Sequence, residues 1–238
     1  MARADSIRTS NADFEDVADL IDNLGTETSN GWIEVDESWA YASSSTVTVS
    51  TDATTRFQVG DKIKFDNSTT KYFYIKTVAS TTLTLNAGSV YTVANSAISN
   101  IYLSRADRAF GFPASFTFAG SPTGFSADPA SAVYNFSIEN GHCIINVYQG
   151  NAGTSNANTF TLTSPFTAAT VSGMTWGVPT WYTADNSTIL TAPGEAKINS
   201  ASATITLVKS IGANSNTWTT SNNKAIGFTN LRFPIAGV

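Results

Sequence analysis

Residues 133–149, VYNFSIENGHCIINVYQ, decide the fold of the second half of this 238-residue chain. Asn140-Gly141 between two alternating apolar runs is the strongest short signal for a β-hairpin, because both residues accept the positive φ of a type I′ turn. The resulting register places three apolar pairs on one face: Ile138 with Cys143, Phe136 with Ile145, and Tyr134 with Val147. The opposite face is mostly polar and carries Asn135, Ser137, Glu139, His142, Asn146 and Tyr148, with Val133 and Ile144 among them. The hairpin is therefore predicted to have one face in the core and one face that is partly exposed to solvent.

Further strand candidates follow this hairpin towards the C-terminus. They are residues 159–166, 174–183, 195–200, 202–210 and 225–235. Several short strands separated by turn signals are typical of a β-sandwich, and we expect a jelly-roll-like one over residues 115–238. No repeat of fixed period is found, which argues against a β-helix or a propeller.

A first β region precedes the sandwich and covers residues 32–114, including a connector at 105–114. Its clearest unit is a hairpin over residues 60–78, in which Ile63 and Phe65 point to one face. Four to six short strands in this region predict a small β-barrel or a compact sandwich. Alternation places four lysines on a solvated face: Lys62, Lys64, Lys71 and Lys76.

Residues 1–31 are predicted to form an N-terminal anchor helix with a linker. A helix is expected over residues 11–24, and Gly25 is a natural stop. Its apolar residues Phe14, Val17, Ile21 and Leu24 have the a/d spacing of a coiled-coil seam. A helix this short is marginal alone in water, so it must pack on its own domain, on sister copies or on a larger partner.

The composition favours self-association over binding to a charged polymer. Charged residues make up 13% of the chain, against roughly 25% in ordinary soluble domains. They are replaced by 28 Ser, 34 Thr and 20 Asn, a neutral polar surface that can pack against a copy of itself. The net charge of −5 provides no basic footprint for nucleic acid. No apolar stretch predicts a secretory signal or membrane insertion, so we expect synthesis and assembly in a cytoplasm.

Catalytic and metal chemistry find little support in the sequence. The chain has one His and one Cys, whereas a zinc site needs three or four such ligands and a nucleophile needs a base beside it. His142 lies across the hairpin from Glu139, which is typical of an exposed cross-strand contact. The carboxylates of the second region form no recognisable glycosidase pair. We therefore expect a protein that is not an enzyme and has no cofactor; Cys143 is expected to be a small buried hydrophobe.

Four aromatic residues form the candidate ligand site: Trp176, Trp181, Tyr182 and Trp218. They lie near Asn, Asp, Ser and Thr residues, and aromatic faces beside hydrogen-bonding groups suit sugar recognition. The alternative is that these residues belong to the core or to a subunit interface. In an unbroken strand Trp176 and Trp181 would point to opposite faces, but Pro179 between them can change this.

Two stretches resemble modules of bacteriophage proteins. The run GTSNANTFTLTSPFTA (residues 153–168), with the hairpin before it, is similar to C-terminal modules of phage fibre proteins. The run TTRFQVGDKIKFDNSTTKYFYIKTV (residues 54–78) resembles a module of phage tail and virion appendage proteins. The resemblance implies a trimeric fibre or spike in the virion, attached to other virion proteins through its N-terminus. A distal β domain would then meet a host-surface glycan.

Three functions remain open from the sequence. The first is a fibre-type virion appendage that binds a host glycan. The second is a purely structural decoration or adaptor protein of the capsid or tail. The third is a glycan-cleaving enzyme, which would need two carboxylates close together in a cleft. An exposed aromatic cluster at the distal end favours the first function, whereas burial of all the Trp residues favours the second.

Overall fold

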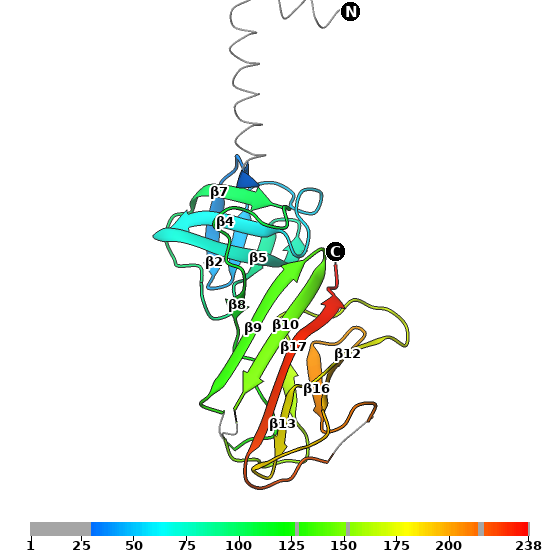
Figure 1. Ribbon diagram of the computed structural model, residues 1–238. Helices are drawn as coiled ribbons and strands as arrows, with labels where there is room; N and C mark the ends of the chain where they lie inside the picture. Colours follow the sequence, from blue (N-terminus) through cyan, green and yellow to red (C-terminus); the bar gives the residue numbers. More distant parts are fainter. Residues whose placement is uncertain (1–29, 127–128, 151–152, 214–216, 238) are drawn as a thin grey trace, which may run out of the picture.

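The computed structural model describes residues 30–126, 129–150, 153–213 and 217–237, and these residues form three antiparallel sheets (Figure 1). The prediction of a mainly β protein is confirmed for this part of the chain. The helix predicted over residues 11–24, with its seam of Phe14, Val17, Ile21 and Leu24, lies outside the described residues.

The first sheet has seven strands in the order β1-β7-β4-β5-β6-β3-β2. Their bounds are β1 Ile33–Glu34, β2 Trp39–Ser43, β3 Thr46–Val49, β4 Lys62–Asn67, β5 Thr69–Ala79, β6 Thr82–Asn86 and β7 Ser99–Ser104. The sheet is curled, and a contact between strands that are not neighbours shows this. Trp39 of the edge strand β2 packs edge-on against Phe65 of β4, with ring centroids 6.1 Å apart. The predicted barrel is nevertheless wrong. Among the described residues the hydrogen-bonded order ends in two edges, since β1 pairs only with β7 and β2 only with β3.

The predicted hairpin of the first region is present as β4 and β5. Ile63 faces Phe73 across the strands, and the turn is a single residue, Ser68, between Asn67 and Thr69. Ser68 has a φ of 66°, a conformation that short polar residues tolerate better than branched ones. Ile63 and Phe65 are buried as the alternation predicts.

The second part is a sandwich of a six-stranded and a four-stranded sheet. The six-stranded sheet has the order β14-β13-β17-β10-β9-β8, with β8 Phe116–Thr117, β9 Ala132–Glu139, β10 His142–Gln149, β13 Tyr182–Asp185, β14 Thr188–Ile189 and β17 Lys224–Pro234. The four-stranded sheet has the order β11-β16-β15-β12, with β11 Thr161–Thr163, β12 Thr175–Pro179, β15 Glu195–Asn199 and β16 Thr204–Val208. Apolar residues of both sheets meet in one core.

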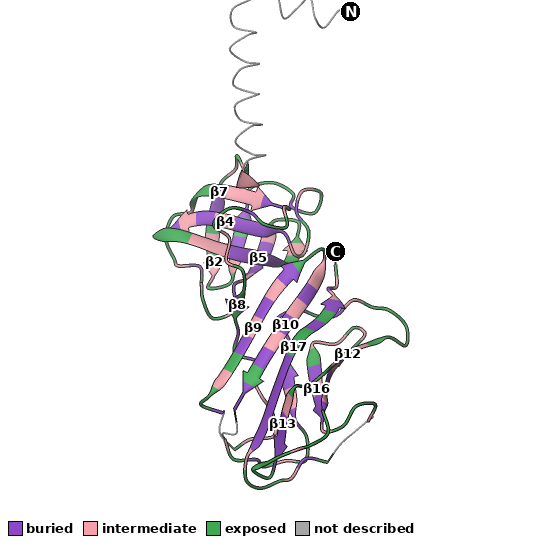
Figure 2. Cartoon of the chain, in the orientation of Figure 1, coloured by how far each residue is buried: buried purple, intermediate pink, exposed green. Residues whose placement is uncertain are grey.

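The Asn140-Gly141 hairpin has the predicted register. Ile138 faces Cys143, Phe136 faces Ile145 and Tyr134 faces Val147. Asn140 and Gly141 both have positive φ, 49° and 69°, as a type I′ turn requires. Burial alternates along both strands, and Figure 2 shows this as a change of colour from residue to residue. Cys143 is fully buried, and burial raises the pKa of its thiol.

An aromatic joint connects the first sheet to the sandwich. The ring of Tyr74 in β5 lies 5.0 Å from Phe112, 5.6 Å from Phe116 and 6.1 Å from Phe136 between centroids. Its hydroxyl accepts the backbone N–H of Ile138 at 3.1 Å. Burial raises the pKa of Tyr74 to about 12, so the hydroxyl stays protonated. The core therefore continues across the sequence boundary predicted after residue 114.

The contacts of the joint define two opposite ends of the molecule, one on the first sheet and one on the sandwich. Ile138, next to the hairpin turn, contacts the first sheet, so the opposite end of β9 and β10 points away from that sheet. In Figure 1 the described chain begins at the end of the first sheet that faces away from the sandwich. There the indole N–H of Trp32 donates to the carbonyl of Phe110 at 2.8 Å. We call the sandwich end remote from the first sheet the distal end.

Candidate functional site

The four aromatic residues expected to form a ligand site occupy different environments in the structure. Trp218 is 2% exposed and belongs to the sandwich core. Its indole N–H donates to the carbonyl of Leu207 at 2.9 Å, and its ring packs edge-on against Phe160 at 5.3 Å. A ligand has no access to Trp218 in this arrangement. Its role is packing, with a hydrogen bond that satisfies the buried indole.

Trp176 and Trp181 are separated because the chain changes sheets between them. Trp176 lies on β12 of the four-stranded sheet and packs half-buried against the core. β12 ends at Pro179, and the next residue, Thr180, is buried, with its hydroxyl accepting the N–H of Gly194 at 2.8 Å. Trp181 then pairs with β17 of the six-stranded sheet, because its N–H donates to the carbonyl of Gly227 at 2.9 Å. The two indoles therefore belong to different sheets.

Trp181 and Tyr182 join Tyr148 in an exposed cluster, which we call the aromatic patch. Trp181 is 61% exposed and Tyr148 45% exposed. Their rings are nearly parallel, with 8° between the planes and 5.7 Å between the centroids. Tyr182 completes the patch at 6.0 Å from Trp181 and 6.2 Å from Tyr148. Large exposed aromatics that are already ordered by one another offer a ligand an apolar surface with little further loss of side-chain entropy.

Strand register explains why these residues meet. Tyr148 of β10 and Tyr182 of β13 both lie opposite Gly227 of β17, so the three residues form one row across three strands. Val133 of β9 extends the row on the other side of Tyr148 and is half exposed. Alternation along β10 places Tyr148 on the outer face of the sheet, whereas the preceding residue, Val147, is buried on the inner face. The row lies towards the distal end, because it crosses the ends of β9 and β10 remote from the hairpin turn.

Gly227 makes room for the indole of Trp181. A Cβ at residue 227 would lie 2.5 Å from Cζ2 and 2.7 Å from Cε2 of Trp181, far inside van der Waals contact. Trp181 therefore lies directly over the backbone of β17, and Gly227 is buried although it is on the outer face of its strand. A side chain in that place would have to displace the indole.

A buried polar network holds the loops at the distal end. Lys224, at the start of β17, is fully buried, and its ammonium donates to the carbonyls of Gly124, Ala157 and Thr159. Burial lowers the pKa of Lys224 to about 8. Across the pair of strands β13 and β17, Lys224 lies opposite Asp185. These three carbonyls come from segments far apart in sequence, so Lys224 ties two loops to the sheet.

Asp185 is the second centre of this network. It pairs with Lys209 at 2.9 Å and accepts hydrogen bonds from the backbone N–H and the hydroxyl of Thr219. Burial opposes ionisation, but these donors outweigh it and lower the pKa of the carboxyl. An ionised carboxylate with its oxygens engaged in this way supports structure rather than proton transfer.

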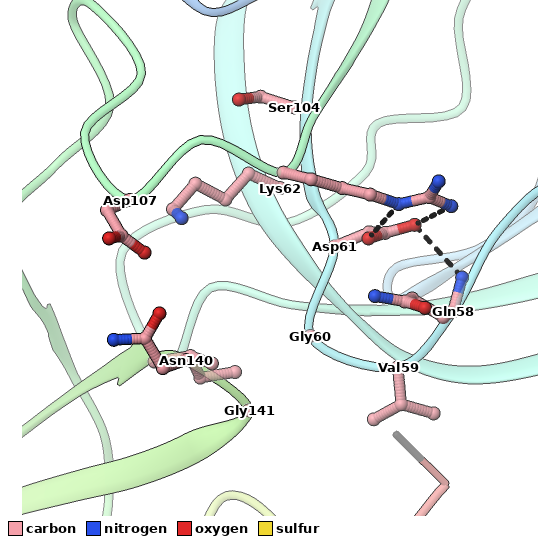
Figure 3. Close-up of a pocket in the computed structure, with 11 residues that line it drawn as sticks. Gln58, Val59, Gly60, Asp61, Lys62, Ser104, Asp107, Asn140 and Gly141 are labelled. Atoms are coloured by element: carbon pink, nitrogen blue, oxygen red, sulfur yellow. Dashed lines mark hydrogen bonds and ion pairs between the residues drawn. The ribbon is translucent and has the colours of Figure 1, made fainter.

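A concave region of about 260 Å³ lies at the joint between the first sheet and the Asn140-Gly141 turn (Figure 3). Asp61 in its wall accepts hydrogen bonds from the Arg105 guanidinium at 3.0 and 3.1 Å. Lys62 is buried and donates to the carbonyl of Ala106 at 2.7 Å, so the predicted solvated face is wrong for this lysine. Burial lowers the pKa of Lys62, against the opposing effect of Asp107. The charged groups in the wall, Asp61 and Lys62, already have hydrogen-bond partners within the protein. We therefore interpret the cleft as part of the joint.

Metal ligation and membrane spanning find no support in the described part of the chain. Residues 30–126, 129–150, 153–213 and 217–237 contain no group of three or more His, Cys, Asp or Glu side chains that could hold a metal ion. Within the same ranges no helix is long and apolar enough to cross a bilayer. His142 bonds through Nδ1 to the carbonyl of Asn140 inside its own turn, at 2.8 Å.

Comparison of the chain with protein-family models, with curated proteins and with solved structures gives no match.

Sequence reasoning found Trp181 and Tyr182 but missed Tyr148 and Gly227 as their partners. Tyr148 was already placed on the outer face of the hairpin by the Asn140-Gly141 register. What the sequence lacks is the pairing of β10 and β13 with β17, which brings residues 148, 182 and 227 into one row. A glycine inside an otherwise apolar strand was the available signal, since it often marks close approach of another group.

Proposed function

We propose that this chain is a structural protein of a bacteriophage virion, a fibre- or spike-type appendage subunit that binds a host-surface glycan through its distal sandwich. The observation that carries the glycan-binding part is the aromatic patch, in which Trp181 is 61% exposed and lies parallel to Tyr148. Large apolar rings on a surface cost free energy in water unless a ligand or partner covers them. Flat aromatic faces suit the C–H faces of sugar rings.

The two ends of the molecule support a division between attachment and recognition. The described chain begins beside Trp32 and Phe110, at the end of the first sheet remote from the sandwich. The aromatic patch lies at the distal end of the sandwich. An N-terminal segment of residues 1–31 would then contact other virion proteins while the patch faces outwards. Such a segment would use Phe14, Val17, Ile21 and Leu24, which lie outside the described residues.

We propose that the sandwich is of jelly-roll-like type. The pairing of β10 with β17 and of β11 with β16 is nested, with early strands beside late ones, as in a jelly roll. The described residues include no matched metal or nucleophile constellation, and the proposed role requires neither catalysis nor a cofactor. Assembly into virions would follow synthesis in the host cytoplasm.

We expect the protein to be a homotrimer. The low charge content and the neutral polar surface allow copies to associate without burying many unpaired charges, and threefold symmetry is what the resemblance to fibres implies. Static light scattering at micromolar concentration should give three times the chain mass of 25.2 kDa. A stable monomer or dimer under these conditions would contradict the prediction.

A decoration or adaptor protein without receptor binding is the second candidate. The observation that favours it is a pair of exposed apolar residues where the described chain begins. Phe110 is 81% exposed and donates its backbone N–H to the carbonyl of Asn30, and Ile33 of β1 is half exposed. Exposed apolar residues at that end suit contact with another protein. This candidate becomes the better one if the aromatic patch binds no saccharide.

Replacing Trp181 by Ala tests glycan binding directly. We expect the full chain to bind saccharides on an array of bacterial surface polysaccharides, and Trp181→Ala to lose at least about tenfold in affinity, the scale of a hot-spot aromatic. The matched control is Phe110→Ala, which removes another exposed aromatic far from the patch and should bind like the unmodified chain. Equal binding by Trp181→Ala and the unmodified chain would contradict the proposal.

A further inference from the structure

We infer that the aromatic patch takes a neutral sugar unit, a hexose or N-acetylhexosamine, and that Gly227 is the positioning residue that seats Trp181 for it. This inference rests on the proposed glycan-binding function and specifies the ligand of the same site. It is carried by three observations: the steric relation of Gly227 to Trp181, the absence of charge in the rows around the patch, and the amide groups beside it.

The parallel arrangement of Trp181 and Tyr148 depends on Gly227. Tyr148 and Tyr182 occupy neighbouring positions on either side of Gly227 in the same row. The missing side chain at 227 leaves a gap between them, and the indole of Trp181 fills it. With any other residue the indole would lift away from the strand, and the 8° angle between its plane and Tyr148 would be lost. Gly227 thus shapes the surface without touching the ligand.

The two outer-face rows that hold the patch and adjoin it on the hairpin contain no charged residue. The row of the patch contains Val133, Tyr148, Gly227 and Tyr182, and the next row of the hairpin pairs Asn135 with Asn146. Neither row holds an acidic or basic side chain. The nearest charged residue in register on this face is Arg232, opposite Ile144, four residues along β10 from Tyr148. An acidic sugar would be recognised by Arg or Lys in direct contact, which these rows do not supply.

Amide groups beside the patch match the hydrogen-bonding groups of a neutral sugar. Asn146 lies two residues along β10 from Tyr148, roughly 7 Å at the rise of a β-strand. Its side-chain oxygen accepts the backbone N–H of Asn230 at 2.9 Å, and its NH2 group is a hydrogen-bond donor. Asn135 lies directly opposite on β9. Carboxamides donate to and accept from hydroxyl and N-acetyl groups without requiring a charge.

The size of the patch fits a saccharide better than a second copy of the chain. Trp181, Tyr148 and Val133 together expose on the order of 300 Å² of apolar surface, given that a large aromatic side chain has roughly 150–250 Å² in all. A stable protein interface buries about 800 Å² on each partner, and roughly 57% of that, about 450 Å², is apolar. One or two sugar rings lying across the parallel rings would cover the exposed area.

The experiment compares matched neutral and acidic oligosaccharides on the full chain. The probes are chitotetraose and cellotetraose as neutral ligands, and a hyaluronan tetrasaccharide and sialyllactose as acidic ones, with the surface-polysaccharide array extending both classes. We expect binding to neutral saccharides, a loss of at least about tenfold in Gly227→Ala, and no change in Gly173→Asn. Gly173→Asn is the matched control because a Cβ there meets nothing within 4 Å and Asn tolerates the positive φ of this residue.

The positioning role of Gly227 has its own readout. Iodide should quench tryptophan fluorescence more strongly in Gly227→Ala than in the unmodified chain, because the indole of Trp181 is displaced into solvent. The double variant Gly227→Ala/Trp181→Ala should be more stable than Gly227→Ala alone, since the added methyl then enters the space that the indole leaves. Additive effects of the two substitutions on the free energy of unfolding would overturn the positioning role. If Gly227→Ala fails to fold, a double variant that also fails to fold would overturn it.

The remaining outcomes separate the inference from the proposed function. Trp181-dependent binding of acidic saccharides alone would overturn the neutral ligand and leave the proposed function standing. Binding of no saccharide of either class would overturn both. A change of Trp181→Ala from oligomer to monomer would identify the patch as an interface between copies and would also overturn both.

Discussion

Replacing Trp218 by Ala should lower the free energy of unfolding by about 3–5 kcal/mol, the cost of truncating a large buried aromatic. Trp218 is 2% exposed, packs edge-on against Phe160 and donates its indole N–H to the carbonyl of Leu207. The substitution opens a cavity and leaves that carbonyl without its donor. Urea denaturation followed by circular dichroism measures the difference.

Trp181→Ala is the matched control for Trp218→Ala, because both remove an indole from the same sandwich. Trp181 is largely exposed, so its removal should change the free energy of unfolding by about 1 kcal/mol or less. The two variants should therefore separate stability from binding. A stable Trp218→Ala variant with impaired saccharide binding would reverse the assignment of the two residues.

Replacing Lys224 by Met should lower the free energy of unfolding by about 3 kcal/mol or more. The substitution keeps much of the side-chain volume but removes the ammonium that serves the carbonyls of Gly124, Ala157 and Thr159. Buried polar groups that lose their partner retain the full cost of desolvation. Chemical denaturation at pH 7 is the measurement, below the value of about 8 to which burial lowers the pKa of Lys224.

Lys76→Met provides the control for Lys224→Met. Lys76 is exposed on β5, so losing its charge should change stability by no more than about 0.5 kcal/mol. Hydrogen exchange offers a second readout, since the segments around residues 124 and 157–159 should lose protection in Lys224→Met. Equal stability of the two variants would show that the three carbonyls do not depend on the ammonium.

The parts of the fold governed by local chemistry could be predicted from sequence. Asn140-Gly141 determines a turn type, the turn type determines the register, and the register determines which residues face the core. The hairpin of β4 and β5 follows from the same alternation. Whether the first sheet closes could not be predicted, because it depends on pairings between strands far apart in sequence, such as β1 with β7, and these leave β1 and β2 as the two edges.

The candidate site was predictable only in part for the same reason. Composition pointed to Trp181 and Tyr182, but Trp218 has similar neighbours in sequence and lies in the core. Trp181 is exposed, unlike Trp218, because the chain changes sheets at Pro179 and Thr180 and so places Trp181 on the outer face of the six-stranded sheet. Lys224 resembles a surface lysine in sequence, and its partners from two distant loops are visible only in the folded chain.

Fluorine NMR of the chain labelled with 5-fluorotryptophan measures whether a saccharide contacts Trp181. The five tryptophans give five signals, and the signal missing in Trp181→Phe identifies Trp181. On titration with a saccharide that the array identifies, we predict that the Trp181 signal shifts while the signals of the buried Trp32, Trp39 and Trp218 stay in place. A saturating ligand that leaves the Trp181 signal unmoved would contradict the account.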